Sequence, residues 1–243
     1  MLRAALRSVS LKPVRDKILE SLYQTTRVAI LEHFIRHGGQ IHVLGGAVRD
    51  AIAFDCGYDG KWAPRDFDLG VTGVRLEEFE YVLSTFGQKN RHGGFVVKEH
   101  GLPVWDLWRL ESSIGLRTTG TFFTLENVLR TFNLDCNAIA LDMHTGVLTD
   151  AGAIEAIRRR RVGFVCGVIK HSYATFAAKA LLMQMRFGYS ASPEVSALVD
   201  AQMDTNTLVY ESRKVFPELP IVSRVPQVRE RACELTWEQK SSR

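Results

Sequence analysis

Two aspartates one residue apart, Asp66 and Asp68, are the side chains of this sequence best placed to do chemistry. They lie in the stretch RDFDLGV (65–71), which alternates polar and apolar residues as a half-buried strand does. On a strand, residues i and i+2 point to the same face, so both carboxylates project together and Phe67 points away. Two such carboxylates suit Mg²⁺, which binds one or two carboxylates plus substrate phosphates. The pattern alone also fits a solvated strand end.

A glycine pair supplies a second feature. Gly45 and Gly46 follow the apolar run QIHVL (40–44) and precede a predicted helix over 47–54. The free N–H groups at the start of a helix bind anions, and Arg49, one turn into this helix, can add charge-assisted bonds to phosphate. The pair could equally serve only a tight turn from strand to helix. Together with the aspartate pair, however, it indicates a site for a nucleoside triphosphate and a metal.

A third carboxylate is expected on a neighbouring strand. The stretch VWDLWRL (104–110) offers Asp106 between apolar residues, and aspartate is rarely buried without a partner or a role. Glu99 is the competing candidate, but it lies beside a predicted turn at 100–103. We therefore favour Asp106.

The elements that must position these residues alternate along the first 150 residues. Helices are predicted over 14–37, as one helix or two, and over 47–54, 76–86 and 171–189; strands are predicted over 40–44 and 65–71; hairpins are predicted over 95–110 and 136–150. This order predicts an α/β fold with a mixed sheet. After residue 158 the strand signals fade. We expect a helical leader packed on the head (1–40), the head (41–165) and a small helical domain (166–243).

Composition restricts the class of protein. The chain has 243 residues, 46% hydrophobic and 24% charged, with a net charge of +4, which permits a polyanionic partner without requiring one. Its four cysteines form no CxxC pair, and no apolar run approaches the ~18–20 residues of a membrane helix. We therefore expect a cytoplasmic protein without a membrane span. The basic stretch over residues 1–15 is either a transit peptide or a leader to the first helix.

The two motifs together resemble a known family. LGGAVRD (44–50) followed by RDFDLGVTG (65–73) resembles the head domain shared by the class II tRNA CCA-adding enzymes and bacterial poly(A) polymerases. The blocks over 133–157 and 177–189 are similar to that family's second motif and neck helix. The resemblance covers about 25–190, and it implies a polymerase-beta-like nucleotidyltransferase head with a mixed sheet, followed by an all-helical neck-like domain.

The resemblance also implies a role for each motif residue. Asp66 and Asp68 would hold Mg²⁺, and Asp106 would activate the acceptor hydroxyl. The nucleotide would be bound by residues of the glycine turn, the second motif and the neck: Gly45, Gly46, Arg49, Asn133, Asn137 and Lys179. Asn137 would in addition brace the wall of the active site.

Two motifs depart from the family pattern. The second motif normally begins Arg-Arg-Asp, but here the aligned residues are Thr131, Phe132 and Asn133. Asn133 can still form a hydrogen bond with a hydroxyl. Two neck arginines fall on Phe176 and Lys179, so one charge remains without the guanidinium fork.

The function implied is metal-dependent transfer of a nucleoside monophosphate from a triphosphate, ATP or CTP, to an acceptor hydroxyl. The expected acceptor is an RNA 3′ end, with tRNA as one candidate. A protein or small-molecule acceptor is an alternative, with the C-terminal helices as a surface for a protein partner. A catalytically silent scaffold that binds nucleotide or RNA is a further alternative.

Overall fold

The computed structural model describes residues 11–23, 27–57, 62–165 and 173–202. The chain forms two compact units, one of residues 1–131 and 137–151 and the other of residues 132–136 and 152–243. The division into 1–40, 41–165 and 166–243 stays a prediction. Within the described ranges, no helix has both the length and the apolar character that crossing a membrane requires.

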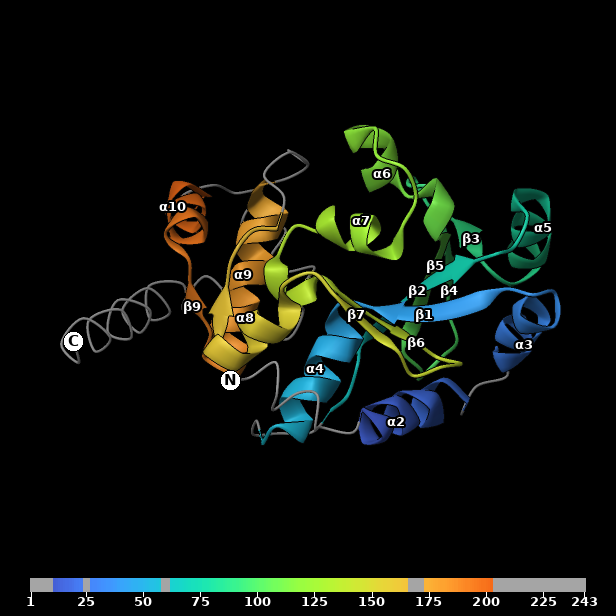
Figure 1. Cartoon of the computed structure of the whole chain (residues 1–243), viewed down its shortest axis with the longest axis horizontal. Coiled ribbons are helices and arrows are strands. Elements are labelled where there is room, and N and C mark those ends of the chain that lie inside the picture. The colour runs from blue at the N-terminus through green and yellow to red at the C-terminus, as the bar shows by residue number, and fades with distance from the viewer. Residues whose placement is uncertain (1–10, 24–26, 58–61, 166–172, 203–243) are drawn as a thin grey trace. The chain divides into compact units, whose positions relative to one another are not determined.

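The first unit contains a seven-stranded mixed sheet in the order β3-β4-β5-β2-β1-β6-β7 (Figure 1). Its strands are β1 (Gln40–Leu44), β2 (Asp66–Thr72), β3 (Gln88–Lys89), β4 (Phe95–Val97), β5 (Val104–Arg109), β6 (Ile139–Asp142) and β7 (Leu148–Asp150). β2 and β5 pair in parallel, whereas the other neighbours are antiparallel. The mixed sheet and both hairpins are confirmed.

Three details of the sheet differ from the prediction. The strand predicted from Cys136 begins at Ile139, because one turn of 3₁₀ helix, η2 (Asp135–Asn137), precedes it. The edge strand β3 was not predicted, since two residues are too few to show a periodic pattern. The strand predicted from Arg65 begins one residue later.

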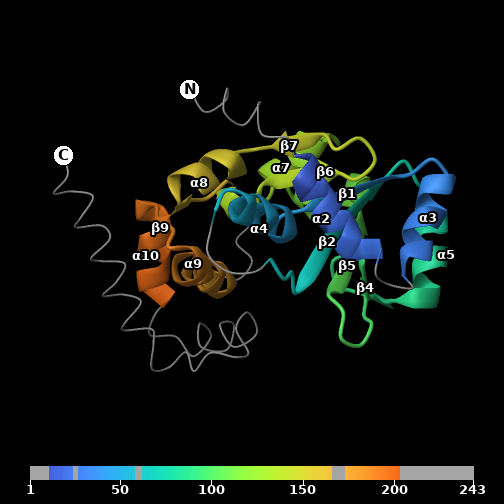
Figure 2. The same ribbon diagram turned by 90° about the horizontal axis from the view of Figure 1, so that it is seen from below.

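Helices cover the sheet of the first unit. They are α2 (Lys12–Tyr23), α3 (Val28–Arg36), α4 (Gly46–Asp55), α5 (Leu76–Phe86), α6 (Ile114–Thr119) and α7 (Leu125–Arg130), with one further 3₁₀ turn, η1 (Leu110–Ser112). The segment 14–37 thus contains two helices. α2 packs against α4, and α3 packs against α5 (Figure 2).

Alternating burial over 66–69 of β2 and 104–107 of β5 separates the core from the site. Phe67 and Trp105 lie opposite each other in the register and are fully buried, as are Leu69 and Leu107 two residues on. The residues between them therefore point to the other face of the sheet. Trp105 is a core residue, because it is fully buried. The guanidinium carbon of Arg27 lies 4.5 Å from the centre of its ring.

In the second unit, the described residues form α8 (Ala153–Arg159), α9 (Tyr173–Phe187) and α10 (Pro193–Gln202). Two short strands, β8 (Arg161–Val162) and β9 (Ser190–Ala191), pair in parallel. The helix predicted over 171–189 corresponds to α9. β9 was not predicted, because a strand of two residues carries too little pattern to be recognised.

Candidate active site

The parallel pairing of β2 and β5 places Asp68 directly opposite Asp106. Asp66 precedes Asp68 by two residues and therefore lies on the same face. The competing candidate Glu99 lies outside these strands, and its carboxylate is 3.3 Å from Nε of Arg27. The structure thus brings three aspartates to one face of the sheet and leaves Glu99 in a structural ion pair.

The two outer carboxylates of this group have different surroundings. Asp66 is half exposed, and its Oδ2 accepts a hydrogen bond of 2.7 Å from Nη2 of Arg65. Asp106 is only partly exposed, and its Oδ1 accepts a 2.9 Å hydrogen bond from Nδ2 of Asn90. Burial raises the pKa of Asp106, the negative charge of Asp66 raises it further, and the bond from Asn90 opposes the shift. A cation at this face would relieve the cost of the ionised form.

Asn90 is the residue of this site that sequence reasoning missed. Its side-chain oxygen accepts hydrogen bonds from the backbone N–H groups of His92, at 2.8 Å, and Gly94, at 3.0 Å. This turn holds the amide in place, so that its nitrogen can donate to Asp106. The only sequence signal is an asparagine at the start of a glycine-containing turn, which ordinarily indicates a turn and nothing more.

The three aspartates form an open arrangement. Their carboxylate oxygens do not all lie within 4.8 Å of one another, and no other described His, Cys, Asp or Glu completes such a group with them. Mg²⁺ usually takes one or two protein carboxylates and completes its octahedron with water and phosphate oxygens. The donor set therefore fits Mg²⁺ bound together with a triphosphate.

The glycine pair forms the predicted turn from β1 into α4. Gly45 has φ +67° and ψ −128°, a conformation that only glycine adopts without strain. Its N–H donates to the carbonyl of Ile139 at 2.9 Å, and its carbonyl accepts from the N–H of Arg49 at 3.0 Å. Leu44 lies opposite Asp68 in the register, so the start of α4 and the carboxylates are at the same end of the strands.

Arg49 has partners within the protein. It is 5% exposed, and its Nε and Nη2 contact Oδ1 of Asp50 at 2.7 and 2.6 Å. Its Nη1 donates to Oδ1 of Asn137, which connects α4 to the turn before β6. The role of Asn137 in bracing the wall of the active site stays a prediction. A contact of Arg49 with the triphosphate stays a prediction.

Two of the predicted nucleotide ligands belong to the second unit. Oδ1 of Asn133 is buried and has no hydrogen-bond partner within the described part of the chain. Lys179 is exposed on α9. The roles of both residues toward a nucleotide stay predictions.

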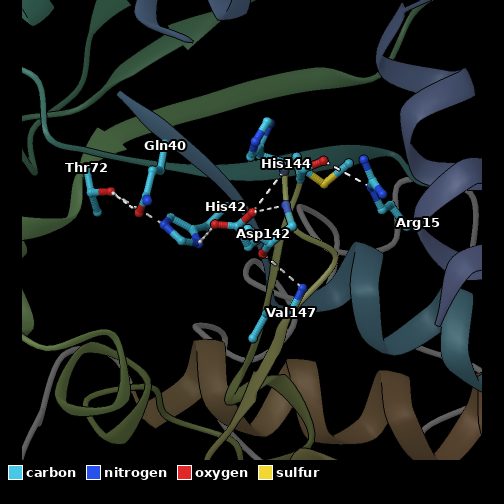
Figure 3. Close-up of polar contacts among 9 residues, drawn as sticks. Arg15, Gln40, His42, Thr72, Asp142, His144 and Val147 are labelled. Atoms are coloured by element: carbon cyan, nitrogen blue, oxygen red, sulfur yellow. Dashed lines mark hydrogen bonds and ion pairs between the residues drawn. The ribbon is translucent and has the colours of Figure 1, made fainter. Parts of the chain in front are cut away.

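A buried histidine, His42, lies in the middle of β1, two residues before Leu44 (Figure 3). Its Nε2 is 3.5 Å from Oγ1 of Thr72, and its Nδ1 is 3.9 Å from Oδ2 of Asp142. The other oxygen of Asp142 accepts from the backbone N–H groups of His144 and Thr145, at 2.9 and 2.6 Å. His42 and Asp142 are both buried, so we assign this network a structural role.

The free energy of unfolding should depend on pH through His42. Burial lowers the pKa of His42, and the nearby carboxylates of Asp142 and Glu111 only partly oppose this. The unfolded state then binds the proton more tightly, so stability is full above pH ~6.5 and falls as the pH drops below it. For one proton this slope cannot exceed about 1.4 kcal/mol per pH unit. Urea unfolding of wild type and His42→Gln between pH 5 and 8 tests this, and equal slopes for both would refute it.

The comparisons with known proteins identify the fold. No model of a protein family matches the sequence, and no curated protein matches it. Among solved structures, the Thermotoga maritima CCA-adding enzyme complexed with tRNA_CCA superposes with a TM-score of 0.56 at 18% identity, over 83% of this chain and 51% of that one. A tRNA nucleotidyltransferase complexed with a primer tRNA and an incoming ATP analog gives 0.57 at 17% identity, over 82% and 59%.

A CCA-adding enzyme in complex with CTP gives a TM-score of 0.56 at 18% identity, over 88% of this chain and 53% of that one. The chain therefore has the nucleotidyltransferase fold of the CCA-adding enzymes, a mixed sheet with helices. It spans between half and three fifths of the length of these three structures. The likeness defines the architecture alone.

Proposed function

We propose that this protein is a metal-dependent nucleotidyltransferase that adds a nucleoside monophosphate to the 3′-hydroxyl of an RNA. The observation that carries the proposal is the placing of Asp66, Asp68 and Asp106 on one face of the sheet, at the end where Gly45 and Gly46 open α4. Carboxylates for a metal and a helix N-terminus for a phosphate are the parts that a triphosphate needs. Structures of the same fold in complex with CTP, an ATP analog and tRNA support this assignment.

Each residue of the site has a part in the proposed transfer. Asp66 and Asp68 would hold Mg²⁺, which when bound stabilises the negative charge that develops on the phosphates. The N–H groups at the start of α4 bind phosphate oxygens. Asp106, held by Asn90, accepts the proton of the acceptor hydroxyl. The acceptor oxygen bonds to the α-phosphorus, the bond to the pyrophosphate oxygen breaks, and most of the acceleration comes from positioning and electrostatics.

The same arrangement predicts that Asp106→Asn changes stability in a metal-dependent way. At neutral pH, burial and Asp66 oppose the ionised form of Asp106, so a neutral amide of the same shape should fold at least as stably. Asparagine keeps the oxygen that accepts from Asn90. We expect the variant to melt at or above the wild-type temperature in EDTA and below it with saturating Mg²⁺ and triphosphate. The same order of melting temperatures in both conditions would contradict a cation bound close enough to Asp106 to offset the cost of its ionised form.

Transfer to RNA is tested directly with purified protein, Mg²⁺, total cellular RNA and each α-labelled nucleoside triphosphate in turn. Label that enters RNA with wild type and not with the double variant Asp66→Ala/Asp68→Ala supports the proposal. Sequencing of the labelled 3′ ends would identify the acceptor and the nucleotide. Release of pyrophosphate without labelled RNA would instead indicate a protein or small-molecule acceptor.

A catalytically silent scaffold that binds nucleotide or RNA is the second candidate. The observation that favours it is the replacement of the second motif's two arginines by Thr131, which is buried, and Phe132. Its signature would be binding of Mg²⁺ and triphosphate without pyrophosphate release for any acceptor. Binding and release are measured on the same preparation, which separates the two candidates.

A further inference from the structure

A group of three metal-ligating side chains lies on α3 and α5, away from the aspartates. His33 and His37 are four residues apart, and their rings stack with centroids 4.2 Å apart. Glu78 of α5 faces both, with its Oε1 3.2 Å from Nε2 of His33 and 3.5 Å from Nδ1 of His37. One ligand atom from each residue lies within 4.8 Å of the other two.

We propose that His33, His37 and Glu78 form a binding site for a transition-metal ion of the Zn²⁺ type. Tetrahedral Zn²⁺ with ligand bonds of about 2.0–2.2 Å requires ligand atoms about 3.4 Å apart, close to the spacing of Glu78 from both imidazoles. Two imidazoles and one carboxylate suit Zn²⁺, whereas Mg²⁺ and Ca²⁺ prefer oxygen ligands alone. Water would complete the coordination, since His33, Glu78 and His37 are 32, 25 and 47% exposed.

The two helices that carry these ligands are fixed against each other. Phe34 and Phe79, the chain neighbours of His33 and Glu78, stack with centroids 5.6 Å apart and are fully buried. Because the backbone on both sides is anchored, only side-chain rotation is needed to bind the ion. A metal here would connect α3 to α5, so we infer that it stabilises this side of the unit.

One existing bond must be exchanged when the ion binds. Nδ1 of His37 lies 2.8 Å from the carbonyl oxygen of His33 and donates a hydrogen bond to it. The coordinating nitrogen of a metal ligand carries no proton, so the imidazole of His37 must change tautomer and carry its proton on Nε2 when the ion binds through Nδ1.

The site is separate from the proposed active site. α3 leads into β1 at Gln40, which lies opposite Thr72, whereas the aspartates lie opposite the far end of β1 at Leu44. α3 and α5 lie side by side, beyond the end of β1 at which Gln40 lies, in both views (Figures 1 and 2). The proposal therefore stands or falls independently of the nucleotidyltransferase assignment.

Titration of the full chain, freed of any histidine tag, with Co²⁺ and Zn²⁺ in the presence of excess Mg²⁺ tests the proposal. The expected result is one ion per chain, the visible absorption of tetrahedral Co²⁺ without a thiolate band, and a melting temperature that Zn²⁺ raises. His33→Gln/His37→Gln should bind at least about 100-fold more weakly, because two of three protein ligands are lost. Glu78→Gln, which leaves both histidines in place, should also weaken binding and provides a second, milder variant.

The matched control is His100→Gln/His144→Gln, which removes two exposed histidines elsewhere and should bind as wild type does. Failure of wild type to bind Zn²⁺ or Co²⁺ more tightly than His33→Gln/His37→Gln would overturn the proposal. Equal weakening by the control pair would do the same, because it would show scattered binding by surface histidines.

Discussion

Asp68→Asn should lower the rate of nucleotide transfer at least about 10³-fold without unfolding the protein. Asp68 is central among the three carboxylates, because it follows Asp66 on β2 and lies opposite Asp106 on β5. Asparagine keeps the shape but removes the charge that would hold the cation. Loss of charge stabilisation worth about 4 kcal/mol in the transition state corresponds to that factor.

The rate is measured as pyrophosphate release in single turnovers, over a range of Mg²⁺ concentrations. The matched control is Asp55→Asn, which removes an exposed aspartate at the end of α4 and should leave the rate within about twofold. Circular dichroism and thermal unfolding establish that both variants fold. If Asp68→Asn lowered the rate tenfold or less and bound Mg²⁺ as tightly as wild type, Asp68 would not be a ligand of the metal.

The aspartate-bearing strands and the glycine turn of this site could be predicted because each depends on a short, local sequence pattern. The alternation through 66–72 fixes which residues share a face, and a glycine pair after an apolar run indicates a turn into a helix. Asp106 was identified by the same logic, as a charge between apolar residues of a strand. These features depend on residues within a few positions of each other, where a periodic pattern is readable.

The features that the sequence did not reveal depend on contacts between distant segments. Asn90 meets Asp106 only because β4 folds back on β5. Arg49 and Asn137 are 88 positions apart, so the sequence near Arg49 does not reveal this contact. An arginine that is buried in an ion pair and one that binds a ligand have the same local sequence pattern. Only the side chains that surround the guanidinium in the fold distinguish them.

The contacts of Arg49 lead to the largest expected change in stability. Arg49→Met should lower the free energy of unfolding by about 3–5 kcal/mol, because the buried carboxylate of Asp50 loses the two guanidinium nitrogens that contact it. The double variant Arg49→Met/Asp50→Leu should recover much of this loss, since it removes both charges together. Urea unfolding of the two variants and wild type measures both effects.

The control is Arg130→Met, which breaks an exposed pair with Glu126 on α7 and should cost no more than about 0.5 kcal/mol. The result also decides what Arg49 does. A large loss of stability that the double variant recovers identifies the guanidinium as the partner that neutralises the buried carboxylate of Asp50. If Arg49→Met lowered the free energy of unfolding by less than about 1 kcal/mol and also weakened triphosphate binding, the charge of Arg49 would instead serve the nucleotide. A side chain that stabilises the fold so little has no structural reason to be charged and buried.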